Sequence, residues 1–264
     1  MKLTSGVSNS LGALGRYGLT WFHHAADLLA FTWRLFSLSV RKPLVGKPLV
    51  HRIVVEQIYF TAVQALPIII PIALLIGAML IVQFGKVASQ YDLGKITVLI
   101  LIREVGPLLT AFIVILRSSV AITAEISYMR ILNEIEAIEL YGIDPMHVLG
   151  YPRLVGITTA MLGLFIIFDL AAVFGGYALA WSLTDIKMEE LLPQMAKALG
   201  GRDIAVGIAK ALFFGVIITV VSLHRGFTVK KEMTAIPVAC SGGAVETLFY
   251  ILAANIFLSI LFYL

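Results

Sequence analysis

Hydrophobic positions divide the chain into long apolar runs separated by short polar segments. Apolar runs of about 18 residues or more are typical of membrane-spanning helices, because about 20 residues at 1.5 Å each cross the hydrocarbon core of a bilayer. Five spans are predicted, at residues 53–83, 96–120, 154–183, 204–223 and 244–264. The first is longer than a bilayer requires, and Pro67 and Pro71 predict a bend in it, since each proline removes a backbone donor.

The segment before the first span has a different pattern. Across residues 8–40, apolar positions recur every three or four residues, and basic or polar residues follow the opposite face. This pattern predicts an amphipathic helix lying in the membrane interface. The alternative is a short first span at residues 19–40, which Asp27 and Arg34 would make costly. Pro43 and Pro48 then break the chain.

Residues 124–142, between the second and third spans, are too charged to cross a membrane and too regular for an irregular loop. They predict one helix, with Gly142 and Pro145 as its stop signal. Two interpretations remain open for this helix. It is either a surface that docks on a soluble partner or a solvated connector.

Composition supports the membrane assignment. Of 264 residues, 59% are hydrophobic and only 14% charged, whereas a soluble domain carries about a quarter charged residues. The mean hydropathy is +0.96. We therefore expect a single all-α integral membrane domain. Residues 1–20 lack the compact apolar core and cleavage site of a signal peptide, so insertion without cleavage is expected.

Basic residues are placed as topology signals. The net charge of +4 does not indicate nucleic-acid binding, because the basic residues lie in loops beside apolar runs and form no continuous face. They are concentrated before the first span and after the fourth. The positive-inside rule therefore predicts a cytoplasmic N-terminus, a cytoplasmic helix at 124–142 and a C-terminus on the outer side.

Ionisable residues inside spans are costly and usually mark function. Here they are Arg103 and Glu104 in the second span, Asp169 in the third and Lys210 in the fourth. Arg103 and Glu104 are adjacent and point about 100° apart on a helix, so they do not pair face to face. The four either line a polar cavity for a lipid headgroup or lock helices together, as Arg103–Asp169 or Glu104–Lys210 pairs. Lys210 could also extend to the membrane interface.

Enzymatic chemistry is not indicated. The chain has no HExxH zinc motif, no GxSxG nucleophile elbow and no GxxxxGK[ST] phosphate loop. Its five histidines lack metal-ligand spacing, and the single Cys240 excludes an internal disulfide. We expect no cofactor on this chain. If ATP drives the protein, ATP and Mg must bind to another chain.

One block of sequence resembles a known family. The run Arg103–Thr110 reads REVGPLLT, and it is followed in order and spacing by Arg117, Ala124-Glu125, Met129-Arg130, Asn133-Glu134-Ile135 and Gly142-Ile143-Asp144-Pro145. This block resembles the signature of the MlaE-type (YrbE/Ttg2B) permeases of MCE-associated ABC phospholipid transporters. The resemblance covers essentially the whole chain, although outside the central block it is mainly one of pattern.

The resemblance implies a homodimeric permease in the bacterial inner membrane. A cytoplasmic ABC ATPase would drive it, a periplasmic MCE-domain protein would exchange phospholipid with it, and in some systems a STAS-domain protein binds the ATPase. An outward-facing lipid cavity between the two copies would involve Arg103, Glu104 and Lys210, with Gln83 and Tyr91 as weaker candidates. The contact that couples the permease to the ATPase would involve Glu134, Glu139, Tyr141, Gly142 and Asp144.

The chain departs from the family pattern at two places. Ser118-Ser119-Val120 stands where members often have Gly-rich residues, and Asn255 stands where many have an acidic residue in the last span. Because of these departures, the second span need not pack as it does in the family, and the last span need not bind a proton or an ion. Two competing hypotheses are a secondary transporter or channel that uses the same buried charges, and a scaffold. An ATPase that co-purifies with the chain would count against the transporter or channel.

Overall fold

The computed structural model describes residues 23, 25–37, 47–85, 100–183 and 201–263. It contains two compact units, residues 1–45 and residues 46–264. In the first unit, residues 25–37 are helical, so this part of the predicted 8–40 helix is observed; the rest lies outside the described residues. Its placement in the membrane interface stays a prediction.

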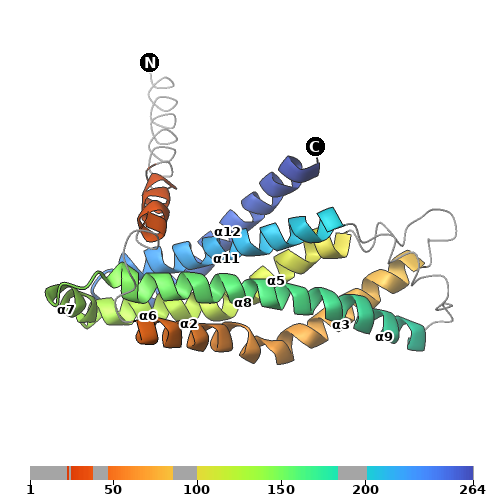
Figure 1. Ribbon diagram of the computed structural model, residues 1–264, viewed down its shortest axis with the longest axis horizontal. Helices are drawn as coiled ribbons and strands as arrows, with labels where there is room; N and C mark the ends of the chain where they lie inside the picture. The colour runs from red at the N-terminus through yellow and green to blue at the C-terminus, as the bar shows by residue number, and fades with distance from the viewer. Residues whose placement is uncertain (1–22, 24, 38–46, 86–99, 184–200, 264) are drawn as a thin grey trace, which may run out of the picture. The chain divides into compact units, whose positions relative to one another are not determined.

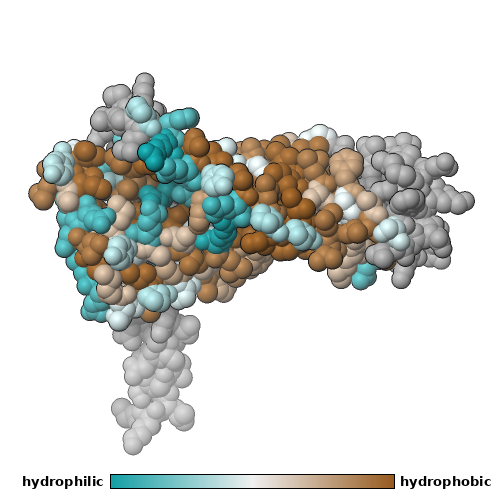
Figure 2. All heavy atoms as spheres, turned by 90° about the horizontal axis from the view of Figure 1, so that it is seen from below, coloured by the Kyte–Doolittle hydropathy of each residue, from teal (hydrophilic) through white to brown (hydrophobic). Residues whose placement is uncertain are grey.

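The described residues of the second unit are mainly helical, joined by short turns, and five of its helical stretches are long and apolar enough to cross a membrane. They run over Val50–Gln83, Leu101–Ile131, Met146–Gly175, Gly201–Phe227 and Ala235–Phe262. This confirms an all-α integral membrane protein with five candidate spans. Figure 2 shows hydrophilic residues gathered toward one end of the molecule and a mainly hydrophobic surface along the middle.

The first span bends. It consists of α2 (Lys47–Thr61), a short 3-10 turn η1 (Val63–Ala65) and α3 (Leu66–Gly85). Figure 1 shows that the chain changes direction between α2 and α3. The change falls just before Pro67, while Pro71 lies inside α3. Proline is tolerated in the first turn of a helix, because the N–H it lacks has no helical acceptor there.

Short π-helical turns interrupt the second and third spans. The second comprises η2 (Leu101–Val105), α5 (Gly106–Val114), η3 (Ile115–Ser119) and α6 (Val120–Ile131). The third comprises η4 (Met146–Gly150), α8 (Tyr151–Leu170), η5 (Ala171–Gly175) and α9 (Gly176–Leu183). A π turn inserts a residue into the helical repeat and so changes which side chains share a face.

The single helix expected at 124–142 is not observed. Instead α6 continues the second span to Ile131, the chain turns at Leu132 and Asn133, and a separate helix α7 (Glu134–Leu140) follows. Asn133 has a left-handed backbone, with φ 58°. The reason lies in packing: Ile122 and Ile126 of α6 are buried, so this stretch belongs to the bundle despite its charges.

The fourth and fifth spans are single helices, α11 (Gly201–Phe227) and α12 (Ala235–Tyr263). The fifth was expected to begin at residue 244, after a segment of small residues. It begins at Ala235 instead, so Gly242 and Gly243 lie inside it. Pro237 falls in its first turn, where proline is tolerated. Gly243 also faces the side chain of Arg225 on α11, a close approach that a small residue permits.

Helix α11 lies at the centre of the bundle and packs against α8, α12 and α6, while α2 packs against α8. A second contact joins α3 to η5 and α9. There Gly77 lies against Ala172 and Gly176: a Cβ on Gly77 would stand 2.0 Å from the carbonyl oxygen of Ala172. Small residues let membrane helices approach closely in this way. The result is a rigid frame on which α11 presents its polar side chains to the second and fifth spans.

Candidate functional site

A buried ion pair joins the second and fourth spans. The Lys210 Nζ lies 2.7 Å from the Glu104 Oε1. The Lys210 side chain is fully buried, whereas that of Glu104 is 33% exposed. Lys210 also donates to the backbone oxygen of Arg103 at 3.0 Å. The pair is one of the two pairings that the sequence left open. The burial of Lys210 argues against its reaching the interface.

The fifth span completes this network. Ser259 accepts a hydrogen bond from Lys210 at 2.7 Å and donates to the Glu104 Oε1 at 2.8 Å. The Asn255 Nδ2 donates to the other carboxylate oxygen of Glu104 at 2.8 Å. Three spans therefore meet at one carboxylate, and we call Glu104, Lys210, Asn255 and Ser259 the outer network. In a low-dielectric interior such hydrogen bonds offset the cost of burying the charges.

Arg103 forms an ion pair with Asp203, near the start of α11. The alternative pairing of Arg103 with Asp169 is therefore wrong. Asp203 and Lys210 are seven residues apart, which places them on one face of α11. That face meets both Arg103 and Glu104, two adjacent residues of η2. The π turn accounts for this, because its wider winding changes the angle between neighbouring side chains.

Asp169 lies apart from the outer network. It is near the end of α8, and its Oδ1 is buried without a hydrogen-bond partner. The oxygen lies against Gly106, where an added Cβ would stand 2.2 Å from it. Asp169 thus contacts the second span next to η2 but joins neither ion pair.

The two weaker candidates for the lipid cavity are not brought to the network. Gln83 is exposed near the end of α3, and no contact with the outer network is observed for it among the described residues. Tyr91 lies outside the described residues. The sequence alone predicts no role for Asn255, Asp203 or Ser259. A signal was present, because Asn255 and Ser259 are four residues apart and so lie on one helical face.

The predicted coupling residues lie on and after α7. Glu134 and Glu139 are exposed, and the side chain of Tyr141 is 84% exposed. Gly142 adopts a left-handed backbone with φ 74°, which favours glycine. Asp144 has a local structural role, since its carboxylate accepts a hydrogen bond from the backbone N–H of Met146 at the start of η4.

A lysine from the loop between α11 and α12 holds α7. The Lys231 Nζ lies 2.7 Å from the Glu136 Oε1 and donates to the Asn133 Oδ1 at 2.6 Å. The hydrogen bond from Lys231 lowers the pKa of the Glu136 carboxyl. This contact ties the position of α7 to the fourth and fifth spans.

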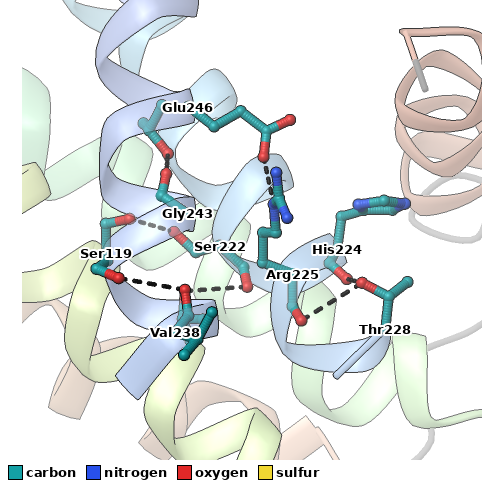
Figure 3. Close-up of polar contacts among 11 residues, drawn as sticks. Ser119, Ser222, His224, Arg225, Thr228, Val238, Gly243 and Glu246 are labelled. Carbon is teal, nitrogen blue, oxygen red and sulfur yellow. Dashed lines mark hydrogen bonds and ion pairs between the residues drawn. The ribbon is translucent and has the colours of Figure 1, made fainter. Parts of the chain in front are cut away.

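Figure 3 shows a further polar cluster where α11 and α12 meet. Ser119 and Ser222 share a hydrogen bond of 2.7 Å, and Arg225 of α11 pairs with Glu246 of α12. Ser119 belongs to the segment that departs from the resembled family. Both serines are buried, so the hydroxyl contact fixes η3 against α11.

The fold and the outer network together define a multi-pass membrane protein with a charged intramembrane site. A family model described as "Permease MlaE" matches residues 54–261. The chain belongs to the MlaE permease family.

Two relatives illustrate the family. A probable ABC transporter permease protein of Rickettsia conorii is 28% identical over 236 residues, which is 88% of this chain and 91% of the relative. The intermembrane phospholipid transport system permease protein MlaE of Haemophilus influenzae is 29% identical over 226 residues, or 84% of this chain and 85% of that protein.

Proposed function

We propose that this chain is the membrane-embedded, non-catalytic permease subunit of an ATP-driven phospholipid transporter. It would act in the bacterial inner membrane as a homodimer. The outer network is the observation that carries the proposal, because a paired but partly exposed carboxylate within a span gives a lipid headgroup a polar contact. The name of the Haemophilus influenzae relative supports phospholipid as the substrate.

The outer network suits a site that opens and closes. Glu104 holds three hydrogen bonds from the fourth and fifth spans, yet a third of its side chain remains exposed. An ammonium or hydroxyl on a headgroup would compete for the same carboxylate oxygens. Such an exchange would change the contact between η2, α11 and α12, and so link lipid binding to helix positions.

The exposed residues of α7 support a contact with a soluble partner. An ABC ATPase, with ATP and Mg bound to it, would dock at the exposed Glu134, Glu139 and Tyr141. In this topology α7 and the N-terminus are cytoplasmic and the C-terminus is periplasmic. A periplasmic MCE-domain protein would then exchange lipid at the opposite end, near the outer network. A STAS-domain protein that binds the ATPase is a further partner of the same proposal.

The test is lipid transfer in proteoliposomes that contain the chain and its ATPase. Transfer of a fluorescent phospholipid to an acceptor MCE-domain protein is followed with and without ATP. We expect transfer to require ATP and to fall at least tenfold in Glu104→Leu, while the ATPase still co-purifies. Val245→Leu, a change at an exposed apolar position of α12, is the control and should leave transfer unchanged. Normal transfer by Glu104→Leu would refute the role of the outer network, and transfer without ATP would favour a secondary transporter.

A further inference from the structure

A pocket of about 260 Å³ opens between the first three spans at the end of the molecule that carries α7. Three helices line it: Ile53, Glu56, Gln57 and Phe60 from α2, Ala121, Ile122 and Glu125 from α6, and Arg153 from α8. No member of the outer network lines it. Figure 2 shows that hydrophilic residues are gathered toward this end of the molecule.

The most buried charged residue of the lining is an arginine with an unused donor. Arg153 is only 4% exposed. It lies 2.7 Å from the Glu125 Oε1 and donates to the backbone oxygen of Leu149 at 2.9 Å. Its Nε is buried and has no hydrogen-bond partner. A buried donor without an acceptor is costly, so a shift of the Arg153 side chain that brought this N–H to a ligand oxygen would be favourable.

The two carboxylates of the lining are more exposed than the arginine. The side chain of Glu125 is 57% exposed, and that of Glu56 is 62% exposed and pairs with Arg52 at 2.8 Å. The positive charge therefore lies deeper in the protein than the two carboxylates, and one of them, Glu125, is paired with it. This order matches a zwitterionic headgroup, with its phosphate turned toward Arg153 and its ammonium held near the carboxylates. A headgroup that carries only negative charge would meet the two carboxylates unfavourably.

The depth of the pocket in the bilayer agrees with this assignment. Glu125 and Glu104 belong to the same helical span, Leu101–Ile131. At 1.5 Å per residue they are about 30 Å apart, which is the thickness of the hydrocarbon core. If the outer network lies at the headgroup level of one leaflet, the pocket lies at the headgroup level of the other.

The size of the pocket limits what it takes. Pockets for drug-sized ligands run from about 300 to 1,000 Å³, so this one suits a headgroup rather than a whole lipid. Acyl chains would lie outside it along α2, where Val55 is 50% exposed and Tyr59 is 55% exposed. Phe60 forms an apolar wall, and the guanidinium of Arg117 lies 4.9 Å from the centre of its ring.

We propose that this pocket binds the headgroup of a zwitterionic phospholipid from the leaflet at the α7 end. The site is separate from the outer network, and binding to it needs neither ATP nor an ATPase. It would place one lipid-binding site at each membrane surface of the same subunit.

The experiment uses the full chain in nanodiscs and a phosphatidylethanolamine that carries a photoreactive group near its headgroup. Cross-linked peptides are mapped by mass spectrometry. We expect label within residues 53–60 and 121–125. Ala121→Phe, which fills the pocket without changing its charge, should lower that label at least fivefold. Ala253→Phe, the same change at an exposed alanine of α12, should leave it unchanged.

Competition distinguishes the headgroup class. Unlabelled phosphatidylethanolamine should suppress the label at least fivefold more effectively than phosphatidylglycerol. Equal competition would overturn the zwitterionic assignment, and label unaffected by Ala121→Phe would overturn the site itself.

If Ala121→Phe does not give a monodisperse helical protein, Glu125→Gln takes its place. This variant should abolish the preference for phosphatidylethanolamine over phosphatidylglycerol, and a preserved preference would refute the proposal. If the pocket does not bind lipid, ATP-dependent lipid transfer by the protein is still expected, so the two proposals can fail independently of one another.

Discussion

Lys210 is a fully buried ammonium, and its three donors all have acceptors: Glu104, Ser259 and the backbone oxygen of Arg103. Burial of a charge is tolerated only when such partners are present. The same contacts that stabilise the charge also connect three spans. The stability of this region and its proposed function therefore depend on the same side chains.

Removal of the ammonium should destabilise the protein. Lys210→Met keeps the length of the side chain but leaves the Glu104 carboxylate in a partly buried position without its cation. Breaking a buried pair costs about 3–5 kcal/mol, and because Glu104 is one-third exposed we expect about 2 kcal/mol. Thermal unfolding in detergent should show a midpoint lower by about 4 °C.

The double variant Lys210→Met/Glu104→Gln separates the pair from simple loss of packing. It should recover part of the lost stability, because no charge is then left unpaired. Arg52→Met, which breaks an exposed pair on α2, should change stability by less than about 0.5 kcal/mol. Additive effects of the two single changes would contradict coupling between Lys210 and Glu104.

Part of this arrangement of charged side chains is predictable from the sequence. The cost of charge in a span was enough to single out Glu104 and Lys210 and to offer their pairing as one alternative. It could not choose the partner of Arg103, because that choice depends on the π turn η2, which leaves no clear mark in the sequence. Asn255 was noted only as a departure from a family pattern. Its hydrogen bond to Glu104 depends on how α12 packs against η2 and α11.

At the scale of helices, the crossing of α3 with η5 and α9 depends on the absence of a side chain at Gly77. An added methyl group would overlap the carbonyl oxygen of Ala172, which belongs to backbone and cannot rotate away. We therefore expect Gly77→Ala to destabilise the protein by about 1–3 kcal/mol through overpacking. Gly163→Ala is the matched control, because a Cβ at Gly163 meets nothing within 4 Å. Its unfolding midpoint should equal or exceed that of the parent protein, and equal losses in both variants would argue against the close crossing.

The contact that holds α7 should depend on pH. The hydrogen bond from Lys231 lowers the pKa of Glu136 below its ordinary value of 4.5. The contact is therefore complete above pH 4.5 and is lost as the pH falls through the lowered pKa, when the carboxyl takes up a proton. Hydrogen exchange of the α7 amides, relative to their intrinsic rates, should show protection that decreases in that window.

Lys231→Gln provides the control for this effect. It should reduce α7 protection at neutral pH and remove the part of the pH dependence that comes from Glu136. The same pH dependence in the variant and the parent would show that another carboxylate is responsible.

The ends of the helices could be predicted from the sequence only where the polar stretches are also the ones that lie outside the packed bundle. The five apolar runs identified the five spans, because a long apolar segment in lipid must satisfy its own backbone hydrogen bonds and therefore forms a helix. The prediction of one separate helix at 124–142 is wrong, because α6 continues the second span and buries Ile122 and Ile126, while the half-exposed Glu125 pairs with the buried Arg153. The start of α12 was placed too late for a similar reason. Its small residues lie inside the helix, and one of them, Gly243, lies against Arg225 of α11.

At the scale of the whole subunit, polar groups are concentrated at two levels about 30 Å apart along the spans. The outer network lies at one level, and the pocket at Arg153 with the α7 contact lies near the other. Helix α11 passes both levels: it carries Lys210 in the outer network, and at its end the loop with Lys231 reaches α7. In the proposed transporter, we expect movement of α7 to reach the outer network through this one helix.

Substitutions at the end of α7 should impair assembly with the ATPase, and substitutions in the outer network should impair lipid transport. Leu140 and Tyr141 expose 89% and 84% of their surfaces at the end of α7, and apolar groups so exposed outside the membrane are typical of a contact with a partner. We expect Leu140→Ser/Tyr141→Ser to reduce co-purification of the ATPase at least tenfold without changing helix content or the unfolding midpoint. Glu104→Gln should have the opposite profile, with normal ATPase association and impaired lipid transfer.

The matched control for the α7 double variant is Phe249→Ser, at an exposed apolar residue within α12, which should leave ATPase association unchanged. If the α7 double variant retains the ATPase, the interface lies elsewhere on the subunit, and if Glu104→Gln loses it, the two ends are not separable in the way that the fold implies.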